Sequence, residues 1–188
     1  LSKEEAIDKV SEFFSAGTVK KFEDAKWQVK VEGFNDLQDE IKEKQPDPQM
    51  LEAAAKFVKA KMKDWKESNI NLQKGIVAFF DTIATTQERV GKRTIQCAMS
   101  FMVDKIGDVK LSVSIKAMLL NMSEQVTPKF ISLQVIKYAA TAKAPNTLKE
   151  SCNMLADILD NFGTSGVPLK ETIDYNKVAC AHATPAVR

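Results

Sequence analysis

Apolar residues recur along this chain at intervals of three and four residues, which is the spacing of one face of an α-helix. The stretch from Trp27 to Ile41 shows this spacing first, and Pro48 suits the first turn of the helix that follows. No stretch shows the sustained alternation of a β-strand, so the pattern predicts an all-α protein. The expected helices cover 27–41, 48–65, 72–83, 95–106, 111–122, 126–140, 148–162 and 169–180, after an N-terminal helix that begins at about Ser2 and breaks near Gly17.

Some helix ends carry more specific signals. Ser123 stands three residues before the next apolar position and is predicted to cap the helix that follows it. Gly163 follows the clearest apolar stripe of the chain and is predicted to end that helix in the left-handed conformation. Leu169, Ile173 and Cys180 mark a weaker stripe, which predicts the last helix.

The predicted helices form pairs, and the turns inside the pairs recur with a regular spacing. Trp27, Asn69, Lys110, Asn146 and Pro185 lie at or near the start of the second helix of each pair, at intervals of 42, 41, 36 and 39 residues. A period of about 40 residues with two helices per unit is typical of HEAT-type solenoids. In such stacks the short turns line one edge of the array. We therefore expect one paddle-like HEAT-repeat domain over residues 1–188, whose loop edge binds a partner.

Composition and charge narrow the class of partner. The chain has 27 Lys and Arg against 25 Asp and Glu, a net charge of +2, which does not favour a general nucleic-acid or membrane binder. No stretch approaches the roughly 20 apolar residues of a membrane span, and the N-terminus lacks the apolar core of a signal peptide. Cys97, Cys152 and Cys180 are odd in number and widely spaced, which favours reduced thiols and a cytoplasmic location.

Residues that could carry catalysis are sparse. His182 is the only histidine, and we interpret it as a loop residue. The segment 91–94 resembles the end of a phosphate-binding loop, but Thr86 occupies the position where that loop requires glycine. The methionines lie on predicted core stripes, so core packing is favoured over an adaptable binding groove: Met99, Met102, Met118, Met122 and Met154. We therefore expect a protein that is not an enzyme and needs no cofactor or metal.

Trp27 is the most informative single residue. Spacing alone leaves it equally suited to the core and to an exposed position in the first turn of its helix, where it would anchor an interface. The charges near the turns favour the second interpretation, because lysines recur there and predict a basic loop edge that faces an acidic surface. These cations are Lys20, Lys21, Lys26 and Lys30 at the first turn, Lys63 and Lys66 at the second, Lys105 and Lys110 at the third, Lys143 and Lys149 at the fourth, and Arg188 at the fifth.

Five segments in order resemble the loops of TOG domains, which occur in arrays in microtubule polymerases of the mini-spindles and colonic-hepatic tumour-overexpressed kind. Residues 25–32, AKWQVKVE, resemble the family's first loop, usually W-K-x-R-x-E, and residues 66–73, KESNINLQ, resemble its second loop with D-x-N. The later matches are VDKIGDVK at 103–110, KAPN at 143–146 and TPAVR at 184–188. The third match and the helix end at 161–163 look most like the third domain of an array.

The resemblance implies a tubulin-binding module that supports microtubule growth, located in the cytoplasm at microtubule plus ends, spindle poles or the centrosome. Its partners would be the αβ-tubulin dimer or the lattice, with other regulatory proteins of such arrays. It implies that the first loops contact β-tubulin and the later ones α-tubulin. The residues that it places in contact with tubulin are Trp27, Gln28, Lys30, Asn69, Lys105, Lys110, Lys143, Lys149 and Arg188.

The chain departs from the family pattern at two places. Gln28 replaces a usual lysine and Lys30 a usual arginine, so a bidentate contact becomes a point charge. The family domain has six helix pairs, whereas this chain ends at Arg188, where the second helix of the fifth pair should begin, so we expect an incomplete domain. A HEAT-type scaffold for another protein partner remains the alternative function, and a helical enzyme is the least favoured one.

Overall fold

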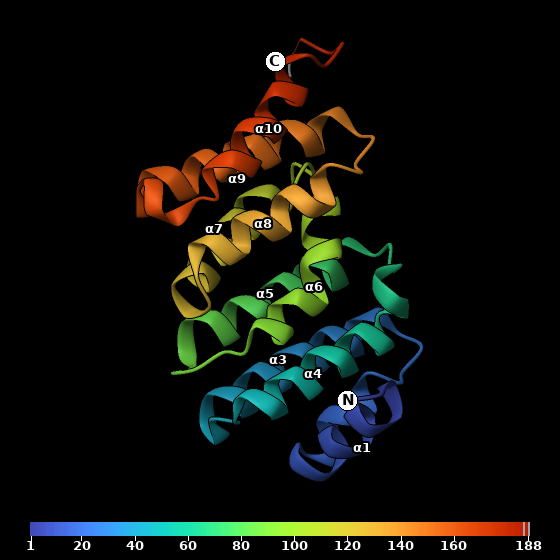
Figure 1. The fold of residues 1–188 in the computed structure, drawn as a ribbon. Helices are drawn as coiled ribbons and strands as arrows, with labels where there is room; N and C mark the ends of the chain where they lie inside the picture. Colours follow the sequence, from blue (N-terminus) through green and yellow to red (C-terminus); the bar gives the residue numbers. More distant parts are fainter. Residues whose placement is uncertain (186, 188) are drawn as a thin grey trace. The chain divides into compact units, whose positions relative to one another are not determined.

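A computed structural model describes residues 1–185 and 187, and these residues form helices joined by short loops, with no β-strand among them (Figure 1). The all-α prediction is confirmed. None of the described helices is both long enough and apolar enough to span a membrane. The α-helices are α1 (Lys3–Phe13), α2 (Ala16–Lys21), α3 (Trp27–Lys44), α4 (Pro48–Lys61), α5 (Ile70–Thr86), α6 (Lys92–Lys105), α7 (Ser112–Gln125), α8 (Pro128–Ala139), α9 (Pro145–Phe162) and α10 (Leu169–Cys180), and single 3₁₀ turns occur at Lys63–Trp65 and Thr164–Gly166.

The break in the N-terminal helix differs from the prediction. It falls at Phe14 and Ser15, whereas Gly17 lies inside α2. Ser15 begins the new helix because its hydroxyl oxygen accepts from the Thr18 backbone N–H at 3.3 Å, which satisfies one of the donors that every helix start leaves free. A good N-cap thus sets the break, and the glycine does not.

The predicted cap at Ser123 is wrong. Ser123 is fully buried within α7, and its hydroxyl donates to the Leu119 carbonyl at 2.7 Å. The cap of α8 is Thr127, whose hydroxyl accepts from the Phe130 backbone N–H at 3.2 Å. Pro128 in the first helical position has no N–H to leave unsatisfied, so the Thr-Pro pair is the stronger start signal.

The end of α9 follows the prediction in part. Gly163 ends the helix with a φ of 69°, a value that favours glycine, and its N–H donates to the Leu159 carbonyl at 2.8 Å. Its ψ of −172° is extended, so the residue does not adopt the left-handed helical conformation that was predicted. The chain turns away from α9 into the 3₁₀ turn at Thr164–Gly166.

The chain forms two compact units, Leu1–Ala98 and Met99–Arg188, and the boundary between them falls inside α6. In the first unit α1 packs against α4 and α3 against α5. Its aromatic centre is Phe22, which meets Phe34 and Phe57 edge to face with ring centroids 5.0 and 5.3 Å apart. Each of these fully buried rings contributes about 2 to 3 kcal/mol of transfer free energy.

In the second unit α8 packs against α7 and α9, and α10 packs against α8 and α9. The five methionines predicted in the core are all fully buried, which confirms that prediction. The predicted stripe of α10 faces outward instead, because Leu169 and Ile173 are about half exposed and Cys180 is exposed. Tyr175 and Ala179, one helical turn apart, form the buried face of α10.

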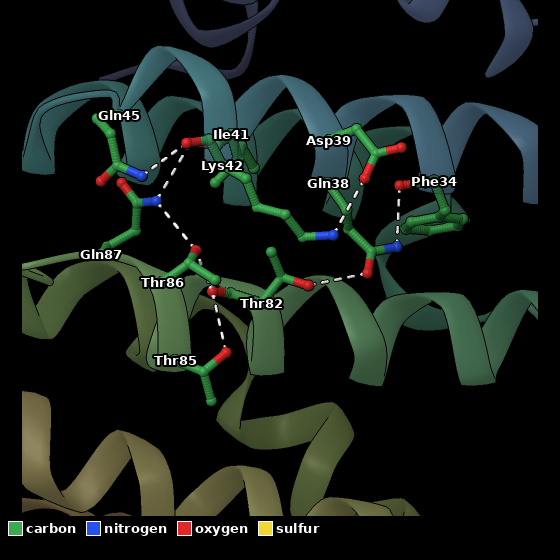
Figure 2. A network of polar contacts seen from close by, with 10 residues as sticks. All are labelled: Phe34, Gln38, Asp39, Ile41, Lys42, Gln45, Thr82, Thr85, Thr86 and Gln87. Atoms are coloured by element: carbon green, nitrogen blue, oxygen red, sulfur yellow. Dashed lines mark hydrogen bonds and ion pairs between the residues drawn. The ribbon is translucent and has the colours of Figure 1, made fainter.

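A polar network joins α3 and α5 within the first unit (Figure 2). The Thr82 hydroxyl donates to Gln38 Oε1 at 2.9 Å, and Gln38 Nε2 donates to the Phe34 carbonyl at 2.9 Å. Beyond the end of α5, Gln87 Nε2 donates to the Ile41 carbonyl at 3.2 Å. Because a shift of either helix would break these bonds, the network fixes how the two helices lie against each other.

Candidate protein-binding loops

The loops inside the helix pairs are the first loop (22–26), the second loop (62–69), the third loop (106–111) and the fourth loop (140–144), followed by the fifth turn (181–185). In the first unit α3 and α5 lie side by side, and the first and second loops lead into them on the same side (Figure 1). In the second unit the third and fourth loops lead into α7 and α9, which also contact each other. The predicted loop edge is therefore present within each unit, and its continuity over all five turns stays a prediction.

The first loop presents Trp27 to solvent. This residue opens α3, and 39% of its surface is exposed, whereas most of the other described aromatic side chains are buried and the rest are half-buried. Lys26 precedes it as the N-cap without a side-chain hydrogen bond to the helix, while its own N–H donates to Asp24 Oδ1 at 2.7 Å. Gln28 is exposed and Lys30 is half-buried in the same turn of helix. An exposed indole on a fixed helix start is suited to anchor an interface.

The second tryptophan has the opposite role. Trp65 is only 9% exposed, its indole N–H donates to the Cys97 carbonyl at 2.9 Å, and its ring meets Phe80 edge to face. The two tryptophans therefore differ, because Trp27 is presented outward and Trp65 is packed into the first unit.

Asn69, predicted as a contact residue, is used to build the second loop. Its side-chain oxygen caps α5 by accepting from the Asn71 N–H at 2.9 Å, and its own N–H donates to the Glu67 carboxylate at 2.9 Å. The side chain is half-buried. These bonds show a structural role for Asn69, and any contact with a partner would be additional to it.

The third loop is shaped by close packing. A Cβ on Gly107 would lie 2.6 Å from the Thr147 backbone nitrogen, so only glycine fits there. The Lys110 backbone N–H donates to Asp108 Oδ1 at 2.7 Å, and this bond orders the turn. The Lys110 side chain is exposed. Lys105, also predicted at this loop, is half-buried and lies 2.9 Å from the Asp104 carboxylate.

Sequence reasoning missed two apolar residues at this loop. Val109 is 90% exposed in the third loop, and Val113 is 77% exposed in the first turn of α7. The signal was available, because neither valine belongs to the stripe that begins at Leu111. Exposed β-branched residues beside an exposed lysine add apolar contact area to a surface that was expected to be mainly charged.

The fourth loop carries the exposed Lys143, and Ala144 begins α9 without a side-chain cap. Lys149, one turn into α9, is half exposed and lies 3.9 Å from the Glu150 carboxylate, which also binds Lys116 at 3.0 Å. A cavity of about 740 Å³ opens beside this loop between α8, α9 and α10. Its lining includes Ile136, Lys143, Leu148, Tyr175, Val178 and His182.

The fifth turn is described only in part. His182 Nδ1 accepts from the Thr184 N–H at 3.0 Å, which agrees with the interpretation of this histidine as a loop residue. Arg188, the predicted cation of this turn, lies outside the described residues. Within the described part of the chain, no group of three or more His, Cys, Asp or Glu side chains is placed to hold a metal ion.

The charge of the loops is mixed. Lys21, expected as a free cation, lies 2.7 Å from Asp36 and 3.7 Å from Glu32, and the hydrogen bond to Asp36 raises the pKa of its ammonium group. Lys63 lies 3.5 Å from the buried Glu67 carboxylate. Part of the predicted basic edge is therefore neutralised by neighbouring acids. The edge cations that are exposed and take part in none of the ion pairs found among the described residues are Lys20, Lys26, Lys66, Lys110 and Lys143.

Comparisons with known proteins agree with this geometry. The family model described as "XMAP215/Dis1/CLASP, TOG domain" matches residues 12–188. Protein MOR1 of Oryza sativa subsp. japonica is 24% identical over 177 residues, and Protein MOR1 of Arabidopsis thaliana is 24% identical over 186 residues. These matches cover 94% and 98% of this chain but 9% of each relative, so the chain spans a small part of their length.

Two solved structures share the fold. Drosophila melanogaster Mini spindles TOG3 superposes with a TM-score of 0.84 at 17% identity, over 93% of this chain and 77% of that one. A second structure, described as "TOG-tubulin binding specificity promotes microtubule dynamics and mitotic spindle formation", superposes with a TM-score of 0.75 at 11% identity, over 99% of this chain and 77% of that one. At these identities the likeness establishes the HEAT-type helical fold.

Proposed function

Because this chain belongs to the XMAP215/Dis1/CLASP family of TOG domains, we propose that it binds αβ-tubulin through its loops, as a module of a longer microtubule polymerase. The observation that carries the proposal is the exposure of Trp27 at the start of α3. A large aromatic side chain that a fold leaves in water at a rigid position is typical of an interface anchor.

The other loop residues serve the same surface in different ways. Gln28 and Lys30 flank the anchor, and Lys105, Lys110, Lys143, Lys149 and Arg188 supply positive charge for an acidic partner. Asn69 keeps the second loop in shape. No step of this function requires chemistry, so the module binds without a cofactor and is not an enzyme.

This proposal places the protein in the cytoplasm on the microtubule cytoskeleton, at plus ends, spindle poles or the centrosome. One module of this kind holds tubulin without polymerising it, since growth needs several modules acting in series. Further regulatory proteins of such arrays would be additional partners. Residues 1–188 would act as a single tubulin-binding domain.

Size-exclusion co-migration with purified αβ-tubulin tests the proposal. The domain should elute with the dimer at low micromolar concentration, and Trp27→Ala should shift it back to its own elution volume. A wild-type domain that never co-migrates with tubulin would favour the alternative, a HEAT-type scaffold for a different protein partner.

A further inference from the structure

The first unit contains a cavity of its own, which is lined mainly by residues of α1, α4 and α6 and has a volume of about 460 Å³. Residues 1–98 as a whole carry equal numbers of basic and acidic side chains. The cavity departs from this balance, because basic side chains outnumber acidic ones in its lining, and we call it the basic cavity. Its charged residues are Lys3, Lys56, Lys59, Arg93, Glu52 and Asp64.

Helical spacing brings the side chains of the basic cavity together. Lys56 and Lys59 lie on one face of α4, because they are three residues apart. The first turn of α6 contributes Arg93, and Cys97 follows on the same face one turn later. Trp65, just beyond the end of α4, donates its indole N–H to the Cys97 carbonyl at 2.9 Å. This bond ties the α4 side of the cavity to the α6 side and fixes the distance between the cations.

The cations of the basic cavity differ in what they contact. The Lys56 ammonium group lies 2.8 Å from the Glu52 carboxylate and donates to the Leu1 carbonyl at 2.7 Å, so its charge is offset and its position is fixed. Lys59 is half-buried and Arg93 is exposed, and neither takes part in a hydrogen bond or ion pair found among the described residues. Burial of a charged group costs free energy unless an opposite charge offsets it, so Lys59 would gain most from a bound anion.

The chemistry of these two cations favours an anion with several charges. Two cations without acidic partners in one cavity repel each other, and a bound anion would remove this repulsion. The guanidinium group of Arg93 offers a planar pair of N–H donors that matches two phosphate oxygens, whereas the Lys59 ammonium group supplies a compact charge. A polyphosphate spreads its charges along a short chain and can meet both groups at once. The volume of the cavity lies in the range of small-molecule sites.

We propose that the basic cavity is a binding site for a compact polyphosphate, which Lys59 and Arg93 contact directly. Lys3 adds positive charge at the same cavity, and Glu52 is a positioning residue because it holds Lys56. The inference goes beyond the proposed function, since its ligand is a small anion and its contacts come from helices. Its failure would therefore leave the proposed binding of tubulin untouched.

Titration of the wild-type domain with inorganic tripolyphosphate tests the inference, by isothermal calorimetry at an ionic strength of about 0.15 M. The double variant Lys59→Gln with Arg93→Gln should bind tripolyphosphate at least about tenfold more weakly, because it loses two charge-assisted contacts. In the amide NMR spectrum of the wild type, tripolyphosphate should shift mainly the signals of residues 56–60 and 93–97. Binding of tripolyphosphate that is no tighter than that of orthophosphate would indicate an adventitious ion only and would overturn the inference.

A matched control removes the same two charges elsewhere in the first unit. Lys74 on α5 and Arg89 before α6 are exposed, form no ion pair among the described residues and do not line the basic cavity. Lys74→Gln with Arg89→Gln should therefore keep the affinity for tripolyphosphate within about twofold of the wild type, since salt screens distant charges. Thermal unfolding checks that both double variants are folded. Equal weakening by the two double variants would mean that only net charge matters, and the inference would be abandoned.

Asp64 provides a test of opposite sign. Its carboxylate lines the basic cavity and should repel a bound polyphosphate. The residue lies in a left-handed turn with a φ of 52°, a conformation that asparagine tolerates, so Asp64→Asn removes the charge and keeps the backbone. This variant should bind tripolyphosphate about two- to fivefold more tightly than the wild type. Unchanged or weaker binding would show that the anion does not occupy the basic cavity.

Discussion

Gly107 in the third loop lies directly against the backbone of Thr147 in the first turn of α9, where an added Cβ would come within 2.6 Å of the Thr147 nitrogen. The Thr147 hydroxyl also donates to the Asp104 carbonyl at 3.4 Å. The end of α6 and the start of α9 are therefore in contact through backbone atoms, which cannot move aside as a flexible side chain can. The shape of the third loop therefore depends on α9, the helix that follows the fourth loop.

Gly107→Ala should consequently destabilise the protein by about 2 kcal/mol or more, since an added methyl would overpack a backbone contact. Urea unfolding followed by circular dichroism measures the change. Gly17→Ala is the matched control, because no atom lies within 4 Å of its added Cβ and the position is helical, so it should stabilise α2 by about 0.5 to 1 kcal/mol. Equal losses from both changes would show that the contact at Gly107 is not tight.

Trp27→Ala should weaken tubulin binding by about 2 kcal/mol or more with little change in stability, because the side chain is an exposed anchor. Trp65→Ala should instead lower the free energy of unfolding by about 3 kcal/mol or more, because that ring is buried and hydrogen-bonded. Isothermal titration and thermal unfolding of both variants test the contrast. A collapse of stability in Trp27→Ala would place that residue in the core.

Reversing Lys105 and Lys110 together, or Lys143 and Lys149 together, should slow association with tubulin and flatten its salt dependence, since charges near an interface act mainly on the association rate. Single reversals should be mild. A control for these reversals needs two exposed lysines that lie away from the loops. Lys42 and Lys44 are not suitable, because the Lys44 ammonium group donates to the Phe13 carbonyl and to Glu40. The exposed lysines at the starts of α8 and α10, Lys129 and Lys170, are suitable. Stopped-flow rates that fall equally for all pairs would mean that only net charge matters.

The Glu40 carboxyl makes the stability of the first unit depend on pH. Burial acts to raise the pKa of its carboxyl, but bonds from Lys44, Thr18 and Ser15 outweigh this and lower the pKa to about 2. A carboxyl with a depressed pKa in the folded state stabilises the fold at pH values above its unfolded pKa of about 4.3, and this contribution, up to about 3 kcal/mol, is lost as the pH falls towards 2.

Glu40→Gln should therefore destabilise the domain near neutral pH and have little effect near pH 2, so that the stability difference from wild type shrinks across this window. Urea titrations at a series of pH values measure it. Asp39→Asn is a control on the same helix, because Asp39 forms only an exposed ion pair with Lys42. A constant difference from pH 7 to pH 2 would contradict the assigned role of Glu40.

The cysteines should divide by reactivity. Cys97 and Cys152 are half-buried, and burial raises the pKa of both thiols, so little thiolate forms near neutral pH. Cys180 is exposed. In the native protein the Cys180 thiol should react rapidly with a disulfide reagent, whereas Cys97 and Cys152 should react only after unfolding. Rapid reaction of all three would refute the placement of Cys97 and Cys152.

The fold was largely predictable, because the residues that a helix buries recur every three to four positions in the sequence. The methionines illustrate this, since all five that lie on predicted stripes are fully buried. The errors arose where two local signals competed. Ser123 and Thr127 are both good caps by type, and only the proline after Thr127 separates them. In α10 the larger apolar residues Leu169 and Ile173 are about half exposed, and Tyr175 and Ala179 form the buried face.

The candidate site was less predictable, because exposure depends on what packs against a residue. Trp27 and Trp65 each lie at one end of a predicted helix, so their sequence signals are similar. Two contacts of the buried Trp65, with the Cys97 carbonyl and with Phe80, are made to residues of other helices. Ion pairs such as Lys21 with Asp36 likewise join residues on different helices. The left-handed turn at Lys63–Trp65 has no glycine to reveal it.

The helices that open at the loops also shape the electrostatics there. Neither α3, α7 nor α9 has a side-chain hydrogen bond at its N-cap. Each such helix start carries the positive pole of its macrodipole, equivalent to about half an elementary charge. Part of the attraction for an acidic partner then belongs to the main chain, and it persists in a variant whose loop lysines have all been replaced.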